Sequence, residues 1–291
     1  MPTYTALINP IAGGGRADAV WTPVAEALSR RGVTVRVEMT RSREHAIETA
    51  AAAAQRGDVV IAVGGDGLAR DAAAGVVPSR ATLAIVPAGR GNDLARKLAL
   101  PADPDALATL IADGTRRTID VIDAAGQIVL GNVYVGVDSV ANEAINNNRW
   151  LPGLLVYRLA PVAAIIKWRA PMFTVESDGR SQTMRAHTVI VANSGAYGHG
   201  LQIVPSAILD DGVLDVMTVA DGPRRKVITF MSKAKTGSHV DSDDVAVHTA
   251  REVTISADRA VPVYADGDLL TQLPVTIAVR PASLSLIAPS A

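Results

Sequence analysis

Three glycine-rich segments hold most of the side chains that could do chemistry. They read NPIAGGG (9–15), GGDGLARD (64–71) and PAGRGNDLAR (87–96), and each follows an apolar, strand-like run. In an open α/β sheet such segments meet at the carboxyl ends of the strands, where ligands bind. Bare N–H groups and helix N-termini at that edge suit a phosphate. The spacing predicts a phosphate site with a carboxylate, Asp66, although each turn alone also fits a plain strand-to-helix connection.

Two acidic turns in the second half of the chain are further candidates. They are DDG (210–212) and ADGD (265–268), and taken alone each is a common turn sequence. Several familiar signatures are absent from the sequence: GxxxxGK[ST] of the P-loop, the third glycine of a dinucleotide fingerprint, and HExxH. These absences argue against a Walker-type ATPase, a Rossmann dehydrogenase and a histidine metal site.

The elements that must position these residues change character along the chain. Up to about residue 114, strand-like runs alternate with helical ones, as in VTVRVEMT (33–40) followed by SREHAIETAAAAAQRG (42–57), where Ser42 is the expected N-cap. The apolar run DVVIAVGG (58–65) is typical of a strand covered on both faces. This rhythm predicts an α/β domain with a parallel sheet and crossover helices over residues 1–118.

After residue 118 the pattern becomes short β-like runs divided by Gly, Asp and Asn turns. It predicts a β-rich, antiparallel, sandwich-like domain over residues 119–291, interrupted by a helical insertion at about 141–168. Trp150 and Trp168 bracket the apolar part of that insertion, a pattern that suits a lipid interface and equally a buried helical hairpin. The cleft between the two domains is the expected place for a site.

Composition narrows the function classes. The chain has 291 residues, 48% hydrophobic and 20% charged, with a net charge of −1 and no cysteine. We therefore expect no bulk nucleic-acid binding and no thiolate chemistry. The N-terminus lacks the features of a signal peptide, and Pro152, Arg158 and Pro161 interrupt the most apolar stretch. The sequence predicts a soluble or peripheral protein.

Together and in this order, the motifs resemble the diacylglycerol kinase catalytic-domain family, bacterial soluble lipid kinases related to sphingosine and ceramide kinases. The three glycine-rich segments are similar to the family's NPxxGxG, GGDGT and PxGTGNDFAR. YVGVDS (134–139), the segment 190–216 and ADGD (265–268) are similar to its later motifs. The resemblance covers nearly the whole chain.

The resemblance implies an enzyme of lipid metabolism and phospholipid biosynthesis. Members transfer the γ-phosphoryl group of ATP to a lipid hydroxyl with Mg²⁺, on an α/β nucleotide domain followed by a β-rich domain. For this chain it implies ATP and a diacylglycerol-like alcohol as substrates, and a cytoplasmic location that extends to the membrane surface. An exposed strand edge would also allow two copies to pair as a homodimer.

The resemblance also implies roles for single residues. Asp268 takes the place of the family's general base, Asp66 acts on the magnesium–phosphate group, and Asp266 stands two residues before the base. A second, structural magnesium would take the Asp211 side chain with the Ile208 and Val213 carbonyls. The residues implied to hold the nucleotide or line its cleft are Asn9, Thr40, Gly64, Gly65, Asp66, Gly67, Arg90, Asn92, Asp93 and Arg96. Asp120 matches another acidic position, at the domain junction.

Four positions depart from the family pattern. Leu68 and Arg90 replace threonines, Arg70 stands where the family usually has Asn or another uncharged residue, and Asp268 is one methylene shorter than Glu. Arg90 would either pair with a phosphate or block the nucleotide. Two alternatives to a lipid kinase therefore stay open. One is an NAD kinase-like small-molecule kinase, which shares the GGDG turn, and the other is a catalytically degraded nucleotide- or lipid-binding protein.

Overall fold

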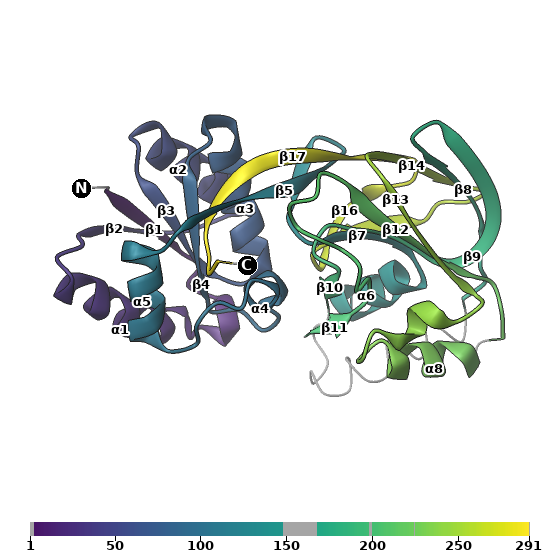
Figure 1. Cartoon of the computed structure of the whole chain (residues 1–291), viewed down its shortest axis with the longest axis horizontal. Helices are drawn as coiled ribbons and strands as arrows, with labels where there is room; N and C mark the ends of the chain where they lie inside the picture. Colours follow the sequence, from purple (N-terminus) through teal and green to yellow (C-terminus); the bar gives the residue numbers. More distant parts are fainter. Residues whose placement is uncertain (1–2, 148–167, 198–199, 224, 291) are drawn as a thin grey trace.

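A computed structural model describes residues 3–147, 168–197, 200–223 and 225–290. Its first part is α/β with parallel strands and its second part is rich in antiparallel strands, so the predicted fold class is confirmed (Figure 1). The two parts lie side by side along the long axis of the molecule.

Four parallel strands form the centre of the first part, in the spatial order β4-β3-β1-β2. They are β1 (Tyr4–Ile8), β2 (Val35–Met39), β3 (Val59–Gly64) and β4 (Thr82–Pro87). Every residue of β1 and β3 is buried, which explains why their sequences are apolar without alternation.

Helices cover both faces of this sheet. They are α1 (Ala17–Arg30), α2 (Arg43–Gln55), α3 (Asp66–Val76), α4 (Asp93–Lys97) and α5 (Pro104–Asp113). Alternate residues of β3 show the two faces, since Val60 and Ala62 pack with α2 and α3 while Ile61 and Val63 pack with α1 and α5. The predicted cap at Ser42 is confirmed, because its hydroxyl accepts the His45 N–H at 3.1 Å.

The second part is built from longer antiparallel pairings around its own apolar core. Its elements are β5 (Arg116–Ala124), β6 (Gln127–Val129), β7 (Asn132–Gly136), α6 (Val137–Asn147), β8 (Met172–Ser177), β9 (Arg180–Ala192), β10 (Ala196–Tyr197), β11 (Leu201–Gln202), β12 (Leu214–Ala220), α8 (Arg225–Lys233), β13 (Val245–Ala250), β14 (Glu252–Ala257), β15 (Pro262–Ala265), β16 (Asp268–Gln272) and β17 (Val275–Ile287). Residues 180–185 of β9 pair with β8, whereas residues 186–192 pair with β12, and 188–192 with β7 as well. One long strand therefore serves two layers, as in a sandwich.

The last strand returns to the first part. β17 runs antiparallel to β5 over most of its length, and its residues Ser285 and Leu286 pair in parallel with β4. In Figure 1 the β5–β17 pair is the arc that joins the two parts. The predicted boundary between residues 118 and 119 falls within β5, so a continuous strand pair fixes the first part against the second.

The predicted helical insertion lies only partly in the described residues. α6 carries its start, while residues 148–167, including Trp150, lie outside the described ranges. Trp168 is described and is buried, with the Arg259 guanidinium 5.0 Å from the ring centre. Its ring therefore packs inside the protein, which at Trp168 favours the buried alternative over the lipid interface. No helix in the described ranges is long and apolar enough to cross a membrane.

Candidate active site

The carboxyl ends of the parallel strands bring several of the predicted residues together. The Asn9 N–H donates to the Val63 carbonyl at 3.2 Å, and the Thr40 N–H donates to the Ile8 carbonyl at 2.8 Å. The Ala88 N–H donates to the Gly64 carbonyl at 2.8 Å, which extends the β3–β4 pairing into the loop. Asn9, Thr40 and Gly64 thus lie at one edge of the sheet, as the sequence predicts.

The three glycine-rich turns also pack against one another. A Cβ at Gly89 would lie 2.4 Å from the Gly65 Cα, and a Cβ at Gly13 would lie 2.5 Å from the Ala88 carbonyl oxygen. At these positions glycine is therefore required by contact between the turns themselves. Gly14 has no neighbour within 4 Å, but its backbone is left-handed (φ +79°), which favours glycine whatever the space around it.

We expect Gly89→Ala to destabilise the protein by about 1–3 kcal/mol, because the added methyl would overlap the Gly65 backbone. Urea unfolding measures the change. Gly67→Ala is the matched control, since its Cβ would meet nothing closer than Asp268 Oδ2 at 3.6 Å and the position lies in α3, where Ala is favoured. Equal stability of the two variants would show that the turns do not pack as described.

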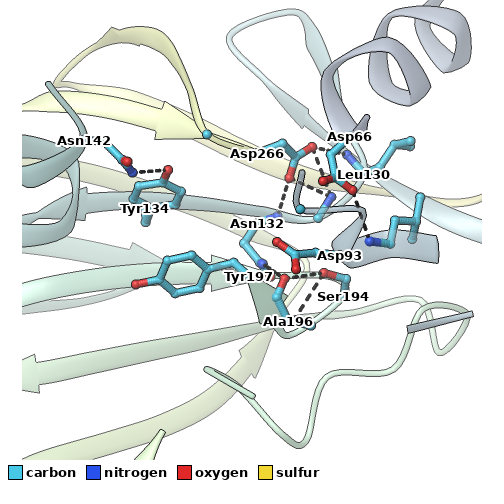
Figure 2. A pocket seen from close by; sticks show the side chains of 14 residues that line it. Asp66, Asp93, Leu130, Asn132, Tyr134, Asn142, Ser194, Ala196, Tyr197 and Asp266 are labelled. Carbon is cyan, nitrogen blue, oxygen red and sulfur yellow. Dashed lines mark hydrogen bonds between the residues drawn. The ribbon is translucent and has the colours of Figure 1, made fainter. Parts of the chain in front are cut away.

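Asp66 stands at the N-terminus of α3, directly after the capping residue Gly65. Its Oδ1 accepts the Leu94 N–H at 3.3 Å, and a Cβ at Gly91 would lie 2.9 Å from its Oδ2. The carboxylate therefore faces the turn that precedes α4 (Figure 2). The free N–H groups at the start of α3 favour negative charge at this point.

The turn before α4 is closed by the Asn92 side chain. Asn92 has a left-handed backbone (φ 54°), its Oδ1 accepts the Gly89 N–H at 2.9 Å, and its Nδ2 donates to the Gly89 carbonyl at 3.0 Å. These bonds occupy its side chain in shaping the turn. Asp93 accepts the Gly200 N–H at 3.1 Å and pairs with Arg96 at 3.5 Å, which connects α4 to the second part.

Asp266 and Asp268 come from the turn between β15 and β16 and reach in different directions. Asp266 accepts the backbone N–H groups of Leu130, Gly131 and Asn132 at 3.0–3.3 Å. Asp268 instead lies against α3, where its Oδ2 is 3.0 Å from an Arg70 nitrogen. Burial raises the pKa of the Asp266 carboxyl to about 6, although the Arg70 guanidinium and the backbone amides act to lower it.

The raised pKa of Asp266 predicts a pH dependence of stability. Because its pKa in the folded protein exceeds its ordinary value of 3.8, this group contributes stability at about pH 4 that is lost as pH rises through about 6. We expect the free energy of unfolding of the wild type, minus that of Asp266→Asn, to fall between about pH 4 and pH 7. Urea unfolding across this range measures it. A difference that rises with pH would mean that the three amides outweigh burial.

A cavity of about 350 Å³, lined in part by three carboxylates, lies where the two parts meet (Figure 2). Asp66 and Asp93 line it from the first part, and Asp266 lines it from the second. The rest of the lining brings in residues whose roles the sequence did not indicate, namely Tyr134, Asn142, Ser194 and Tyr197.

Two stacked tyrosines form part of the second-part wall of the cavity. The Tyr134 and Tyr197 rings stack with centroids 5.6 Å apart, and Asn142 Nδ2 donates to the Tyr134 hydroxyl at 2.7 Å. Tyr197 also hydrogen-bonds Asp138, a carboxyl whose pKa is raised by burial. Both rings come from motifs quoted above, YVGVDS and the segment 190–216. The two motifs therefore pointed to this part of the site, but nothing in their sequences distinguished Tyr134 and Tyr197 from the residues around them.

The predicted second magnesium site lies on the loop before β12. Asp211 Oδ1 accepts the Val213 N–H at 3.2 Å, and Ile208 is exposed. Asp120 anchors this loop by accepting the Gly212 and Ala282 N–H groups, each at 2.7 Å. One carboxylate with two carbonyls is an all-oxygen donor set that suits Mg²⁺ with added waters. The described residues contain no cluster of three or more His, Asp or Glu that could hold a metal.

Comparisons with known proteins agree with this arrangement. The diacylglycerol kinase catalytic domain model matches residues 3–124, and the YegS C-terminal NAD kinase beta sandwich-like domain model matches residues 131–288. A diacylglycerol kinase of Mycobacterium tuberculosis is 34% identical over 98% of this chain and 94% of its own length. The chain belongs to the diacylglycerol kinase family. Membership of a kinase family supports a phosphotransferase.

More distant proteins match most of the chain in sequence or in fold. A diacylglycerol kinase of Bacillus subtilis is 24% identical to this chain, in a match that covers 92% of this chain and 90% of the Bacillus protein. A solved structure of a diacylglycerol kinase from Bacillus anthracis has a TM-score of 0.78 at 23% identity, covering 98% of this chain and 96% of the other. At that identity the structure shows the fold alone. The catalytic-domain model spans Asp66, whereas Asp266 and Asp268 fall in the second model.

Proposed function

We propose that this family member is a lipid kinase that transfers the γ-phosphoryl group of ATP to the hydroxyl of a diacylglycerol-like lipid. The observation that carries the proposal is the position of Asp268. Its carboxylate, from the second part, lies 3.6 Å from where a Cβ at Gly67 would be, and so over the first turn of α3. On this proposal, a carboxylate that would accept a hydroxyl proton lies next to a helix N-terminus that would bind a phosphate.

On the donor side, we assign the nucleotide to the carboxyl edge of the parallel sheet. Asn9, Thr40 and the Gly64–Gly67 turn would hold it, and the exposed Arg90 and Arg96 side chains would contact phosphate oxygens. Leu68 is buried close to Gly64, so this departure from the family places no side chain among the phosphates.

Magnesium would bind the donor through Asp66, and a structural ion would bind Asp211 with the Ile208 and Val213 carbonyls. When bound, the first ion would neutralise charge on the phosphates. Asp66 stands at a helix terminus with its Oδ2 close to Gly91, which places a hard oxygen ligand beside the glycine turns.

On the acceptor side, the cavity with the Tyr134 and Tyr197 rings would receive the head of the lipid. Asp268 would take the proton of the acceptor hydroxyl while that oxygen bonds to the γ-phosphorus and the bond to the β–γ bridging oxygen breaks, which releases ADP. Because a lipid acceptor resides in a bilayer, the protein would work in the cytoplasm at the membrane surface. β2, at the edge of the sheet, would be the strand through which two copies pair.

One observation favours a second candidate. The model that matches residues 131–288 describes an NAD kinase-like sandwich, and NAD kinases also phosphorylate a hydroxyl. We rank this reading lower because the relatives that match over most of the chain are diacylglycerol kinases. The third alternative is a protein that binds nucleotide or lipid without catalysis. Its main support is that Arg90 and Arg70 depart from the family pattern.

The test is transfer from γ-labelled ATP with Mg²⁺ to a panel of acceptors. Diacylglycerol, monoacylglycerol, ceramide and sphingosine are presented in mixed micelles, beside NAD in solution. Label on a lipid supports the proposal and names the acceptor. Label on NAD alone replaces it with the second candidate. No label, with ATP still bound in equilibrium dialysis, supports the binding-protein reading.

A further inference from the structure

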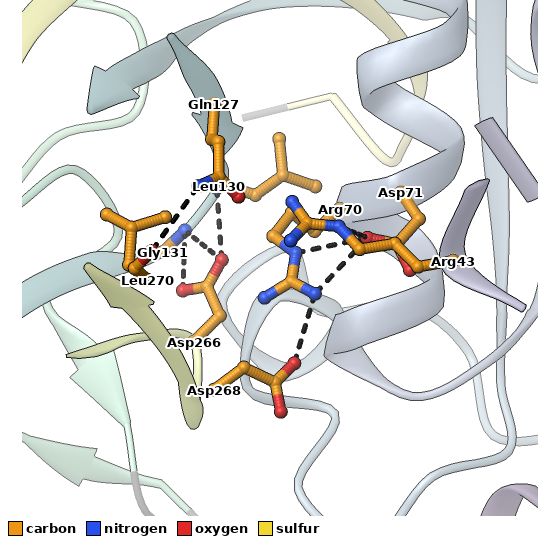
Figure 3. A network of polar contacts seen from close by, with 9 residues as sticks. All are labelled: Arg43, Arg70, Asp71, Gln127, Leu130, Gly131, Asp266, Asp268 and Leu270. Atoms are coloured by element: carbon orange, nitrogen blue, oxygen red, sulfur yellow. Dashed lines mark hydrogen bonds and ion pairs between the residues drawn. The ribbon is translucent and has the colours of Figure 1, made fainter. Parts of the chain in front are cut away.

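A buried arginine joins the two parts of the molecule at Asp268. Arg70, on α3, is 4% exposed, and one of its terminal nitrogens lies 3.0 Å from Asp268 Oδ2 and 3.2 Å from Asp71 Oδ1. Its Nε also donates to Asp71 at 3.2 Å. Arg43, on α2, pairs with Asp71 from the other side at 3.2 Å. Figure 3 shows the resulting chain of charges from α2 through α3 to the start of β16.

The Arg70 guanidinium pairs with carboxylates of the protein and does not face the cleft as a phosphate-binding group would. A guanidinium that contacts a phosphate must present its N–H groups to the cleft, but this side chain is only 5% exposed. Its Nε and one terminal nitrogen contact a carboxylate on its own helix, and the same terminal nitrogen also contacts a carboxylate from the facing turn. A planar, permanently charged guanidinium can fix two carboxylates at once in this way, which an ammonium does less well.

Asp268 depends on such a partner more than its neighbour does. Asp266 is held by three backbone amides, whereas the Asp268 side chain is 53% exposed on the hairpin and the ion pair with Arg70 is its described side-chain contact. A carboxylate on an exposed turn samples several rotamers unless something holds it. The buried cation supplies that constraint, since Asp71 and α3 fix its own position.

We propose that Arg70 is a positioning residue that holds the Asp268 carboxylate over the first turn of α3, where the acceptor hydroxyl must give up its proton. This inference rests on the proposed function, because it assumes that Asp268 takes that proton. In this proposal Arg70 orients the Asp268 carboxylate and does not contact the substrate. A misplacement of about 1 Å in such a group is enough to cost about 100-fold in rate.

Steady-state kinetics with ATP and micellar diacylglycerol test the inference. We expect Arg70→Gln to lower kcat by about 10- to 100-fold while KM for ATP stays within about twofold of the wild type. Arg70→Lys should recover part of the loss, because it keeps the charge without the fork. The matched control is Arg43→Gln, which removes the other guanidinium from Asp71; among the described residues Arg43 forms its ion pair with Asp71 and none with the β15–β16 turn.

Dependence on Asp268 separates positioning from a general structural effect. In an Asp268→Asn background, Arg70→Gln should lower kcat by no more than about twofold further, because the group that it positions is already absent. A full additional loss in that background would overturn the inference. So would an Arg70→Gln variant with the same kcat as Arg43→Gln.

Removal of a buried charge can unfold a protein when its partner stays behind. The double variant Arg70→Gln/Asp71→Asn removes both charges of the α3 pair, and circular dichroism with urea unfolding shows whether it is folded. It should reproduce the kcat loss of Arg70→Gln, and wild-type kcat in the folded double variant would overturn the inference. A wild type that transfers no phosphoryl group to any lipid would overturn the proposed function and this inference with it, whereas the outcomes above remove the inference alone.

Discussion

Asp66→Asn should abolish phosphoryl transfer, with kcat lowered about 10³-fold or more, while the fold stays intact. On the proposed function, this carboxylate holds the magnesium that neutralises charge on the phosphates, an effect worth several kcal/mol in the transition state. Asparagine keeps an oxygen to accept the Leu94 N–H, so the structural contact survives while the charge is lost. Transfer of label from ATP, measured beside urea unfolding, checks both parts.

A matched control for Asp66→Asn is Asp105→Asn. Asp105 also lies in the first turn of a helix of the first part, and its ion pair with Arg30 is exposed. This variant should keep wild-type kcat. If Asp66→Asn retained a tenth or more of the wild-type rate, about 10³-fold catalysis by this group would be ruled out and the metal would have to bind elsewhere.

Asp268→Asn has the second largest expected effect, a fall in kcat of about 10²–10⁴-fold with little change in KM for ATP. The amide cannot take the acceptor proton. It also leaves Arg70 paired with Asp71 alone. Because the nucleotide is assigned to the other side of the cleft, its binding should persist, and equilibrium dialysis with ATP measures it.

The conservative variant Asp268→Glu is the control for Asp268→Asn. It keeps a carboxylate on the same turn and should retain far more activity than the amide. Equal loss in both variants would indicate that the position matters for packing of the β15–β16 turn and not for proton transfer.

Local patterns in the sequence predicted the parallel half of the fold well. The unbroken apolar run that became β3 is buried along its whole length, and Ser42 caps α2 as its position before a helical segment suggests. The cap depends on a residue three positions away, and the burial of β3 on both faces leaves an unbroken apolar run, so both features can be recognised along a sequence. The motif order added the family, which the comparisons confirm.

Features that depend on distant contacts were not predictable in the same way. Arg70 and Asp268 are separated by almost 200 residues, and the sequence marked both as departures without showing that they touch. The burial of Trp168 under Arg259 is similar, since an aromatic residue at the end of an apolar run looks the same whether lipid or protein covers it.

The contact between two glycine turns and the stacking of two tyrosines also could not be predicted from the sequence. The glycines at 65 and 89 look like phosphate-binding residues in the sequence, and only the packing shows that their backbones touch each other. The stacked Tyr134 and Tyr197 rings come from strands that become neighbours through the tertiary fold.

The most direct test of the central claim is a structure of the protein with Mg²⁺ and a non-hydrolysable ATP analogue. We expect the γ-phosphate at the N-terminus of α3, with magnesium on Asp66, the base of the nucleotide toward Asn9 and Thr40, and the Asp268 carboxylate facing the γ-phosphorus. A triphosphate bound away from the glycine-rich turns, or turned so that Asp268 and the cavity of Tyr134 face the adenine, would contradict the account.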